Sequence, residues 1–468
     1  MLRFGTDGLR GLANAELTPE LVMALGRAAA RVLVKPIGGP TQRHRFVVGR
    51  DTRLSSPLLQ AALSAGLASE GVDVLDVGVL PTPGVAHISV MESVPAAVVS
   101  ASHNPYWDNG VKFFSTSGAK LSDEVESALE SELGAVLSAS RAKPPRANDE
   151  VGVIEADPTA AERYTQHLLA CLGERGLRGL RVALDCANGA VFEVAPRVLR
   201  AAGAEVVAVL GNRPDGTNIN QACGSTHPSG LAEAVVLERA DLGLAFDGDA
   251  DRLIAVDALG NVVDGDRLLA LFATDLVGRG ELAGRSVVVT VMTNLGFHQA
   301  MAAAGVQVHT VNVGDRYVLE ALDANGWALG GEQSGHVIFR DLATTGDGLL
   351  TGLLLADLVV RRGRPLSELA AGAMRRMPQV LRNVPVGARD LLGQAPGLPV
   401  WQAVKQVETE LSGQGRVLLR PSGTEPVVRV MVEAPSQEQA EAAADHLVTA
   451  LQAALGGKEP SGEAVSQT

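Results

Sequence analysis

A unit of strands and helices recurs three times along this chain, and the recurrence limits the fold more than any other feature. Each copy has three short apolar runs, rich in valine, leucine and alanine, separated by stretches with helical periodicity. Strands that alternate with helices form βαβ units in parallel or mixed sheets. The third run of each copy leads into a polar loop, and these runs are 96–99, 242–246 and 327–329. The sequence therefore predicts three similar mixed-sheet α/β domains.

The last part of the chain follows a different plan. Strands predicted at 416–419 and 427–432 flank a short loop, and a helix is predicted at about 436–455. This plan indicates a smaller α+β C-terminal domain. From breaks in the pattern we expect domains at 1–152, 153–258, 259–370 and 371–456, followed by a disordered tail at 457–468.

The first polar loop, Ser100–Pro105, holds a candidate nucleophile. Open α/β sheets bind ligands at the carboxyl ends of their strands, where Ser102 is expected. Serine is a weak nucleophile and needs activation. The adjacent His103 suggests a Ser/His hydrolase, but the Gly-x-Ser-x-Gly elbow is absent. Neighbours on an extended chain also point to opposite sides, so we expect His103 to be a turn residue.

The second polar loop contains the clearest chemical signal. Alternate side chains of an extended loop share one side, and the carboxylates of Asp247, Asp249 and Asp251 would repel each other there without a cation. Hard oxygen ligands suit Mg²⁺ or Ca²⁺. An EF-hand is excluded because Arg252 and Ala258 stand where its glycine and glutamate belong.

A metal loop favours phosphoryl chemistry over acyl chemistry at Ser102. In this interpretation a phosphate on Ser102 is one of the metal ligands, and the dication offsets charge during transfer. Lys112 is the candidate proton acceptor if burial and nearby cations lower its pKa, although a surface lysine remains the alternative.

Three further segments are candidates for binding. Glu332, Ser334 and His336 of the third polar loop can bond sugar hydroxyls, and the histidine can move a proton, although a structural turn is an equal alternative. The glycine-rich segment 4–11 is expected to be a loop that brings Arg10 to an anion. A C-terminal group of small residues flanked by arginines fits a phosphate, with a plain hairpin as the alternative: Arg420, Ser422, Gly423, Thr424 and Arg429.

Composition argues against two classes of partner. The net charge of −13 disfavours nucleic acid and anionic membranes. Aromatic residues make up only 3% of the chain, too few for base-stacking platforms. The N-terminus has no apolar signal segment, and no apolar run is long enough to span a bilayer. We therefore expect a soluble cytoplasmic protein.

Taken together, four motifs resemble the α-D-phosphohexomutase family over residues 1–455 and follow the family's order. Ser100–Pro105 looks like its phosphoserine loop, Asp247–Arg252 like its metal loop, Gly331–His336 like its sugar-binding loop, and Arg420–Pro426 like its phosphate-binding loop.

Within the family, the chain is most similar to bacterial members that act on glucosamine phosphates. The residues that carry this similarity are Phe4–Gly8, Pro214–Asn220, Cys223–Pro228 and Gln333, where relatives acting on mannose and glucose phosphates tend to have methionine. Leu9 and Trp107 depart mildly from the commonest choices, isoleucine and tyrosine.

The resemblance implies three similar α/β domains and a smaller C-terminal domain around one cleft. It implies an isomerase, an intramolecular phosphotransferase that interconverts glucosamine 6-phosphate and glucosamine 1-phosphate through glucosamine 1,6-bisphosphate, on the route to UDP-N-acetylglucosamine. One Mg²⁺ per site would be held by Ser102, Asp247, Asp249 and Asp251. Lys112 and His336 would be the acid/base pair, Arg10 would lie near the reacting phosphate, and Arg420–Arg429 would hold the distal phosphate.

Alternatives remain open at this point. They are a mutase of the same family that prefers mannose or glucose phosphates, a non-catalytic sugar-phosphate sensor, and a metal-dependent hydrolase. The expected partner is a phosphorylated amino sugar. The sequence does not fix the oligomeric state, and a homodimer is compatible with it.

Overall fold

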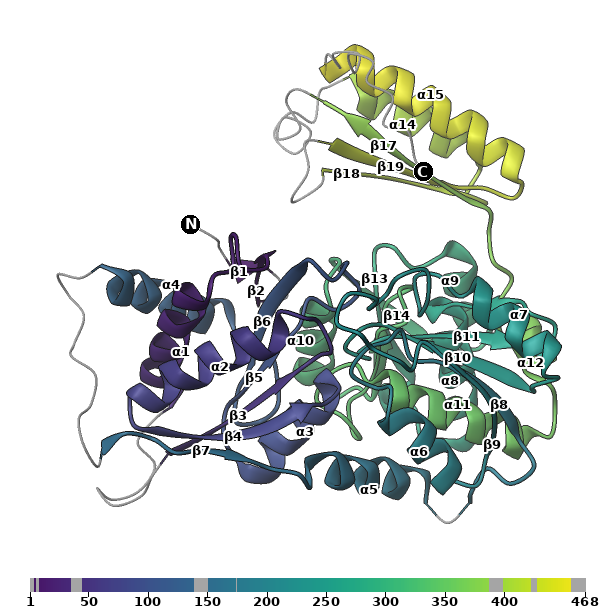
Figure 1. Ribbon diagram of the computed structural model, residues 1–468. Helices are drawn as coiled ribbons and strands as arrows, with labels where there is room; N and C mark the ends of the chain where they lie inside the picture. Colours follow the sequence, from purple (N-terminus) through teal and green to yellow (C-terminus); the bar gives the residue numbers. More distant parts are fainter. Residues whose placement is uncertain are drawn as a thin grey trace. The chain divides into compact units, whose positions relative to one another are not determined.

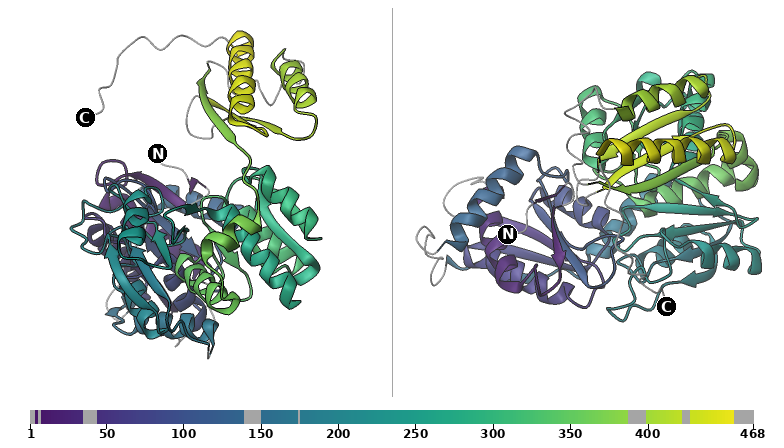
Figure 2. Two further views of the ribbon diagram at one scale, coloured as in Figure 1. Left: turned by 90° about the vertical axis from the view of Figure 1, so that its right-hand side faces the viewer. Right: turned by 90° about the horizontal axis from the view of Figure 1, so that it is seen from above.

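A computed structural model describes residues 8–34, 44–138, 150–173, 175–386, 399–421 and 427–455, together with the backbone of 4–5. The predicted tail at 457–468 lies outside the described residues. The chain divides into two compact units. The large unit is Met1–Thr293 with Met301–Ala373, and the small unit is Asn294–Ala300 with Met374–Thr468. Figures 1 and 2 show the elements of both units.

The first sheet of the large unit has seven strands. Their order is β1 (Phe4–Gly5), β2 (Gly8–Leu12), β6 (Asp108–Phe114), β5 (Ala96–Val99), β3 (His44–Arg50), β4 (Val72–Val79) and β7 (Ile154–Ala156). The pairs among β5, β3, β4 and β7 are parallel, whereas β6, β2 and β1 add antiparallel pairs. The helices of this part are α1 (Pro19–Leu33), α2 (Ser56–Ser69), α3 (Thr82–Glu92) and α4 (Asp123–Leu137).

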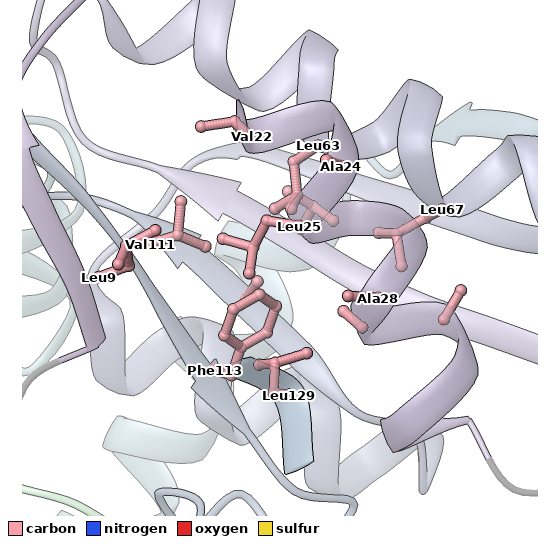
Figure 3. Packing of buried hydrophobic residues seen from close by; sticks show 14 of the residues in the cluster. Leu9, Val22, Ala24, Leu25, Ala28, Leu63, Leu67, Val111, Phe113 and Leu129 are labelled. Atoms are coloured by element: carbon pink, nitrogen blue, oxygen red, sulfur yellow. The ribbon is translucent and has the colours of Figure 1, made fainter. Parts of the chain in front are cut away.

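Aliphatic side chains of α1 and α2 cover one face of this sheet. Leu25 and Leu63 are fully buried together with Phe113 of β6, and Figure 3 shows them in one cluster. Thr18 caps α1 by accepting from the backbone N–H of Leu21, and proline stands in the first turn, where it loses no helical hydrogen bond. The core is aliphatic because the chain has few aromatic residues.

Two more sheets complete the large unit. The second has the order β12 (Val262–Val263), β11 (Leu253–Asp257), β10 (Leu242–Phe246), β8 (Arg181–Asp185) and β9 (Glu205–Leu210). The third has the order β14 (Gln307–Val311), β13 (Ser286–Thr290), β15 (Leu329–Gly331) and β16 (Val337–Phe339). Their helices are α5 (Ala160–Leu172), α6 (Val194–Ala201), α7 (Ser229–Leu237), α8 (Gly265–Arg279), α10 (Asp315–Asn325), α11 (Gly348–Arg362) and α12 (Leu366–Ala373). Helix α9 (Leu295–Ala303) begins in the small unit and ends in the large one.

The small unit has one antiparallel sheet with the order β17 (Gln379–Pro385), β19 (Val427–Glu433) and β18 (Arg416–Pro421). Helices α14 (Pro399–Glu410) and α15 (Gln437–Leu455) share a core with this sheet. The prediction of three α/β domains and a smaller α+β domain is confirmed. Among the described residues, no helix combines the length and the apolar character needed to cross a membrane.

The three polar loops occupy equivalent positions in the three sheets. Each connects the third strand of its copy to a strand that runs back antiparallel beside it: β5 to β6, β10 to β11 and β15 to β16. Both ends of each loop are therefore held by neighbouring strands of one sheet.

The prediction of a loop at 4–11 was wrong. Residues Gly8–Leu12 form strand β2, which pairs with β6 so that Arg10 lies opposite Gly110. Gly8 has a φ of 82°, and a Cβ on it would lie 2.2 Å from the carbonyl oxygen of Val111. Here glycine permits a tight approach between strands and does not indicate irregular structure.

Candidate active site

Ser102 lies in the loop after β5, and its side chain reaches the aspartate loop, Asp247–Arg252, which follows β10 of the second sheet. Its Oγ donates a hydrogen bond of 2.6 Å to Oδ2 of Asp247, and its exposed fraction is 1%. The φ of Ser102 is 53°, in the left-handed region that non-glycine residues seldom occupy. Such strain persists where the surroundings fix the backbone, and it occurs most often at functional sites.

The three aspartates meet as the sequence predicts. Asp247, Asp249 and Asp251 are buried, and one oxygen from each lies within 4.8 Å of the others. Burial raises the pKa of Asp247 well above its usual range, and the carboxylates of Asp251 and Asp249 add to the effect. Within the described residues, Oδ1 of Asp249 and Oδ1 of Asp251 are buried without a hydrogen-bond partner. Clustered carboxylates with free oxygens fit a hard divalent cation.

Lys112 is buried beside these carboxylates, with an exposed fraction of 2%. Its Nζ lies 2.7 Å from Oδ2 of Asp249 and 3.4 Å from Oδ2 of Asp251. The hydroxyl of Thr82, the first residue of α3, donates to the same Oδ2 of Asp249 at 2.7 Å. The alternative of a solvated surface lysine is therefore wrong. Lys112 forms ion pairs with both of these carboxylates.

His336 connects the third sheet to the same cluster. Its Nδ1 lies 3.8 Å from Oδ2 of Asp251, and its Nε2 lies 3.3 Å from Oδ2 of Asp315. Burial disfavours the charged ring, but the carboxylates of Asp315, Asp251 and Glu332 outweigh it and raise the pKa of His336. The backbone N–H of Gly346 also lies 3.1 Å from Nε2. A neutral ring can accept from Gly346, and a charged ring can donate to Asp315, so both protonation states have a partner.

His103 lies in a turn, as expected, but its side chain does not point away from Ser102. Its Nδ1 lies 3.3 Å from Oγ of Ser102, because the backbone at Ser102 is left-handed and does not continue the extended strand. Burial lowers the pKa of His103 to about 4, and the guanidinium groups of Arg252 and Arg10 act in the same direction. The charge of Arg10 therefore acts on His103, and its expected place near a reacting phosphate stays a prediction.

Glu332 and Ser334 precede His336 in the loop between β15 and β16. Oε1 of Glu332 accepts from the backbone N–H of Gly314 at 3.1 Å, and burial raises the pKa of its carboxyl. Within the described part of the chain, the buried Oγ of Ser334 has no hydrogen-bond partner. A free hydroxyl and a carboxyl close to His336 can bond the hydroxyl or amino groups of a sugar.

In the small unit, Arg420 of β18 lies directly opposite Arg429 of β19. Directly opposed residues of an antiparallel pair share a face, so the two guanidinium groups project from one side of the sheet. The pair therefore suits a phosphate group. Ser422, Gly423 and Thr424 lie outside the described residues.

Sequence reasoning missed four residues that surround these groups: Arg53, Thr82, Asn220 and Asp315. Asn220 belongs to a motif that indicated only the resemblance to the family. Nothing in the sequence marked Arg53, Thr82 or Asp315 as functional residues. Each becomes visible only through contacts between segments far apart in the chain.

Comparison with known families decides the class. Four domain models match along the chain, each described as phosphoglucomutase/phosphomannomutase: α/β/α domain I at 1–139, domain II at 162–260, domain III at 264–377 and the C-terminal domain at 375–450. The chain belongs to the phosphoglucomutase/phosphomannomutase family. Membership confirms the predicted phosphohexomutase class, and the chain is an isomerase that works by phosphoryl transfer.

Relatives in this phosphoglucomutase/phosphomannomutase family include two proteins named phosphoglucosamine mutase. The one from Desulforudis audaxviator is 53% identical over 436 residues, which cover 93% of this chain and 94% of that protein. The one from Rhodococcus opacus is 53% identical over 445 residues, which cover 95% of this chain and 98% of that protein.

Solved structures of similar proteins agree with the fold. A phosphoglucomutase/phosphomannomutase family protein from Burkholderia thailandensis has a TM-score of 0.78 and 26% identity, with 97% of this chain and 98% of that chain covered. Aspergillus fumigatus N-acetylphosphoglucosamine mutase, solved with GlcNAc-6P and magnesium, has a TM-score of 0.64 and 19% identity, with 97% and 96% covered.

Proposed function

We propose that this chain acts as a phosphoglucosamine mutase, which interconverts glucosamine 6-phosphate and glucosamine 1-phosphate. The observation that carries the chemistry is the contact between Ser102 and Asp247 beside two carboxylates with unpaired oxygens. The substrate follows from relatives of that name that are 53% identical over nearly the whole chain.

The reaction has two phosphoryl transfers. In the first, the bond between phosphorus and Oγ of phosphorylated Ser102 breaks, and a bond forms to the free hydroxyl oxygen of the sugar phosphate, whose proton leaves. The product is glucosamine 1,6-bisphosphate. In the second, the other phosphoryl group returns to Oγ of Ser102, and the released sugar oxygen takes up a proton. The enzyme regains its phosphoserine, and the sugar leaves as the other isomer.

Asp247, Asp249, Asp251 and the phosphate on Ser102 would hold one Mg²⁺. Such an ion supplies charge that offsets the developing negative charge on the transferred group. Three buried carboxylates, two of which have an oxygen without a hydrogen-bond partner among the described residues, fit this ion because magnesium prefers oxygen ligands.

His336 moves the proton in this proposal, because its ring has a partner in either protonation state. Lys112 was expected to be the second proton-transfer residue; we propose instead that it pairs with Asp249 and Asp251 and neutralises charge on the transferred phosphoryl group. Arg10 assists from β2. His336, Lys112 and Arg10 thus have distinct catalytic roles. Substitutions of the three residues should therefore lower the activity for different reasons.

The remaining candidate residues bind the substrate. Glu332 and Ser334 bond the sugar, and a buried carboxylate such as Glu332 suits an amino group. The residues of the small unit proposed to bind a phosphate are Arg420, Ser422, Gly423, Thr424 and Arg429.

A substrate panel tests the proposal. Turnover is compared on the 1-phosphates of glucosamine, glucose and mannose, with Mg²⁺ and a catalytic amount of the matching 1,6-bisphosphate. We expect the highest kcat/KM for glucosamine 1-phosphate, and a preference for glucose or mannose would refute the assignment. Intact mass should show one added phosphate on wild type and on the exposed-site control Ser117→Ala, but none on Ser102→Ala. Steady release of inorganic phosphate would indicate a hydrolase instead.

A further inference from the structure

The backbone of the Ser102 loop is held by two side chains from other segments. The carbonyl oxygen of Ser102 accepts from Nη2 of Arg53 at 2.8 Å and from Nδ2 of Asn220 at 2.9 Å. The carbonyl oxygen of Asn104 accepts from the same two side chains, at 3.0 and 3.1 Å. Arg53 also donates to the carbonyl of Pro105 at 2.9 Å. The carbonyl groups of Ser102 and Asn104 are thus both bound by the side chains of Arg53 and Asn220.

Arg53 is a fixed part of the surrounding core. Its exposed fraction is 1%, and its Nε lies 2.9 Å from Oδ2 of Asp51. The same Oδ2 accepts from the hydroxyl of Ser100 at 2.7 Å, and Oγ of Ser100 accepts from the backbone N–H of Ser102 at 3.0 Å. Both backbone groups of Ser102 are therefore bonded, which explains how its left-handed conformation is maintained.

Asn220 comes from the connection between β9 and α7, far from the Ser102 loop in sequence. Its exposed fraction is 8%, and its backbone N–H donates to the carbonyl of Ala187 at 2.9 Å. Asp185, at the end of β8, accepts from the backbone N–H groups of Ala187 and Gly224, at 3.0 and 2.7 Å. The connection is thereby fixed to the end of the second sheet, and it carries the Asn220 amide at a set position.

Asn220 also packs against the aspartate loop, Asp247–Arg252. A Cβ on Gly248, between two of the aspartates, would lie 2.5 Å from the carbonyl oxygen of Ser102 and 2.9 Å from Nδ2 of Asn220. The amide therefore sits where the Ser102 loop and the aspartate loop touch. A shift of this amide would change the distance between Ser102 Oγ and Asp247.

We propose that Asn220 is a positioning residue for phosphoryl transfer at Ser102, and that Arg53 supports it by binding the same two carbonyl oxygens. The charge on Oγ changes each time a phosphoryl group arrives or leaves, so the loop carrying Oγ experiences a changing force during turnover. Two donors on its carbonyl groups keep Oγ near Asp247 in both states. The inference rests on the proposed role of Ser102 as phosphate carrier.

The experiment measures how fast unphosphorylated protein takes up phosphate from glucose 1,6-bisphosphate, by intact mass with Mg²⁺ present. Asn220→Ala removes the donors, and Asn220→Asp keeps the shape but turns an oxygen toward two carbonyl oxygens. Since small misplacements of a reacting group cost up to about 10²-fold, we expect uptake to slow by roughly 10- to 100-fold in both variants. The KM for the sugar phosphate should stay within about twofold, because Asn220 touches the loop and not the sugar.

Asn212→Ala, an exposed asparagine in the same connection, is the matched control and should behave as wild type. Circular dichroism at the assay temperature restricts the comparison to folded protein. Phosphate uptake at the wild-type rate in both Asn220 variants would overturn this inference but not the proposed function. A defect confined to KM would do the same. A wild-type chain that takes up no phosphate overturns the proposed function, and the inference with it.

Discussion

Nζ of Lys112 lies 2.7 Å from Oδ2 of Asp249, although 137 positions separate the two residues in the chain. The pair is almost fully excluded from water, with side-chain exposures of 2% and 0%. Removing one member of a buried ion pair leaves the other charge without compensation. The stability of the unloaded enzyme and its chemistry therefore depend on the same contact.

Lys112→Met should lower the free energy of unfolding by about 3–5 kcal/mol in the absence of divalent metal. Added Mg²⁺ should restore part of that loss, because the ion compensates Asp249 and Asp251 in place of the ammonium. Denaturant titrations with and without Mg²⁺ measure both quantities. The exposed Lys405→Met is the control, and equal losses in the two variants would contradict the role of the buried pair.

Asp249→Asn should weaken divalent binding strongly, because a carboxylate with an unpaired buried oxygen is replaced by a neutral amide. We expect at least a tenfold rise in the dissociation constant for Mn²⁺, used as a probe of the Mg²⁺ site, measured by calorimetry. The control is Asp323→Asn, whose carboxylate is partly exposed and pairs with Arg340. Unchanged binding by Asp249→Asn would remove this residue from the ligand set.

Gly248→Ala should reduce turnover by at least tenfold while the fold survives. Its Cβ would lie 2.5 Å from the carbonyl oxygen of Ser102, so the Ser102 loop and the aspartate loop must separate. Gly134→Ala, in α4 with open space around it, should instead stabilise the protein by roughly 0.5–1 kcal/mol. Steady-state rates and thermal melts distinguish the two effects, and full activity of Gly248→Ala would show that the loops tolerate separation.

Stability should depend on pH through Asp347, a buried cap of α11 that also accepts from the hydroxyl of Tyr164 at 2.8 Å. Burial raises the pKa of Asp347 to about 6. Because the folded pKa lies above the unfolded one, this group favours folding at low pH, and that contribution is lost as pH rises through about 6. The difference amounts to about 3 kcal/mol.

Asp347→Asn keeps the cap and removes the titration. Relative to wild type, the variant should therefore gain stability between pH 4.5 and pH 7.5, by about 2 kcal/mol. Chemical denaturation of both proteins at the two pH values gives this difference directly. Wild-type and variant stabilities that run parallel across the range would count against a raised pKa.

The fold was largely predictable because its signals are local. The strands before Ser102, Asp247 and Glu332 are short apolar runs, and their alternation with helices defines the α/β class. The antiparallel strands β6, β11 and β16 were not predicted, because each directly follows a polar loop that was interpreted as the end of a strand–helix unit. The segment at 4–11 was misjudged because glycine serves close strand pairing as readily as a loop.

The site was predictable where chemistry depends on residue type and not where it depends on distant contacts. Ser102 and the three aspartates are specified by their own loops. By contrast, Lys112 of the first sheet and His336 of the third both contact Asp251, which follows a strand of the second sheet, and no spacing in the sequence encodes those distances. His103 lies in a turn as predicted, but its contact with Ser102 was missed because an extended backbone was assumed at Ser102, whereas the φ of Ser102 is 53°.

The pairing of β5 with β6 restricts how the length of the Ser102 loop can change. Lys112 lies opposite Val98 on one face of the sheet, while its neighbours Val111 and Phe113 belong to the hydrophobic core on the other. Side chains alternate along a strand, so a gain or loss of one residue that shifts this pairing would turn the ammonium into the core. Changes by two residues would keep its orientation. The segment between Ser102 and Lys112 can therefore change length only by an even number of residues if Lys112 is to keep its orientation. Related chains that have both residues should differ in this segment by even numbers of residues.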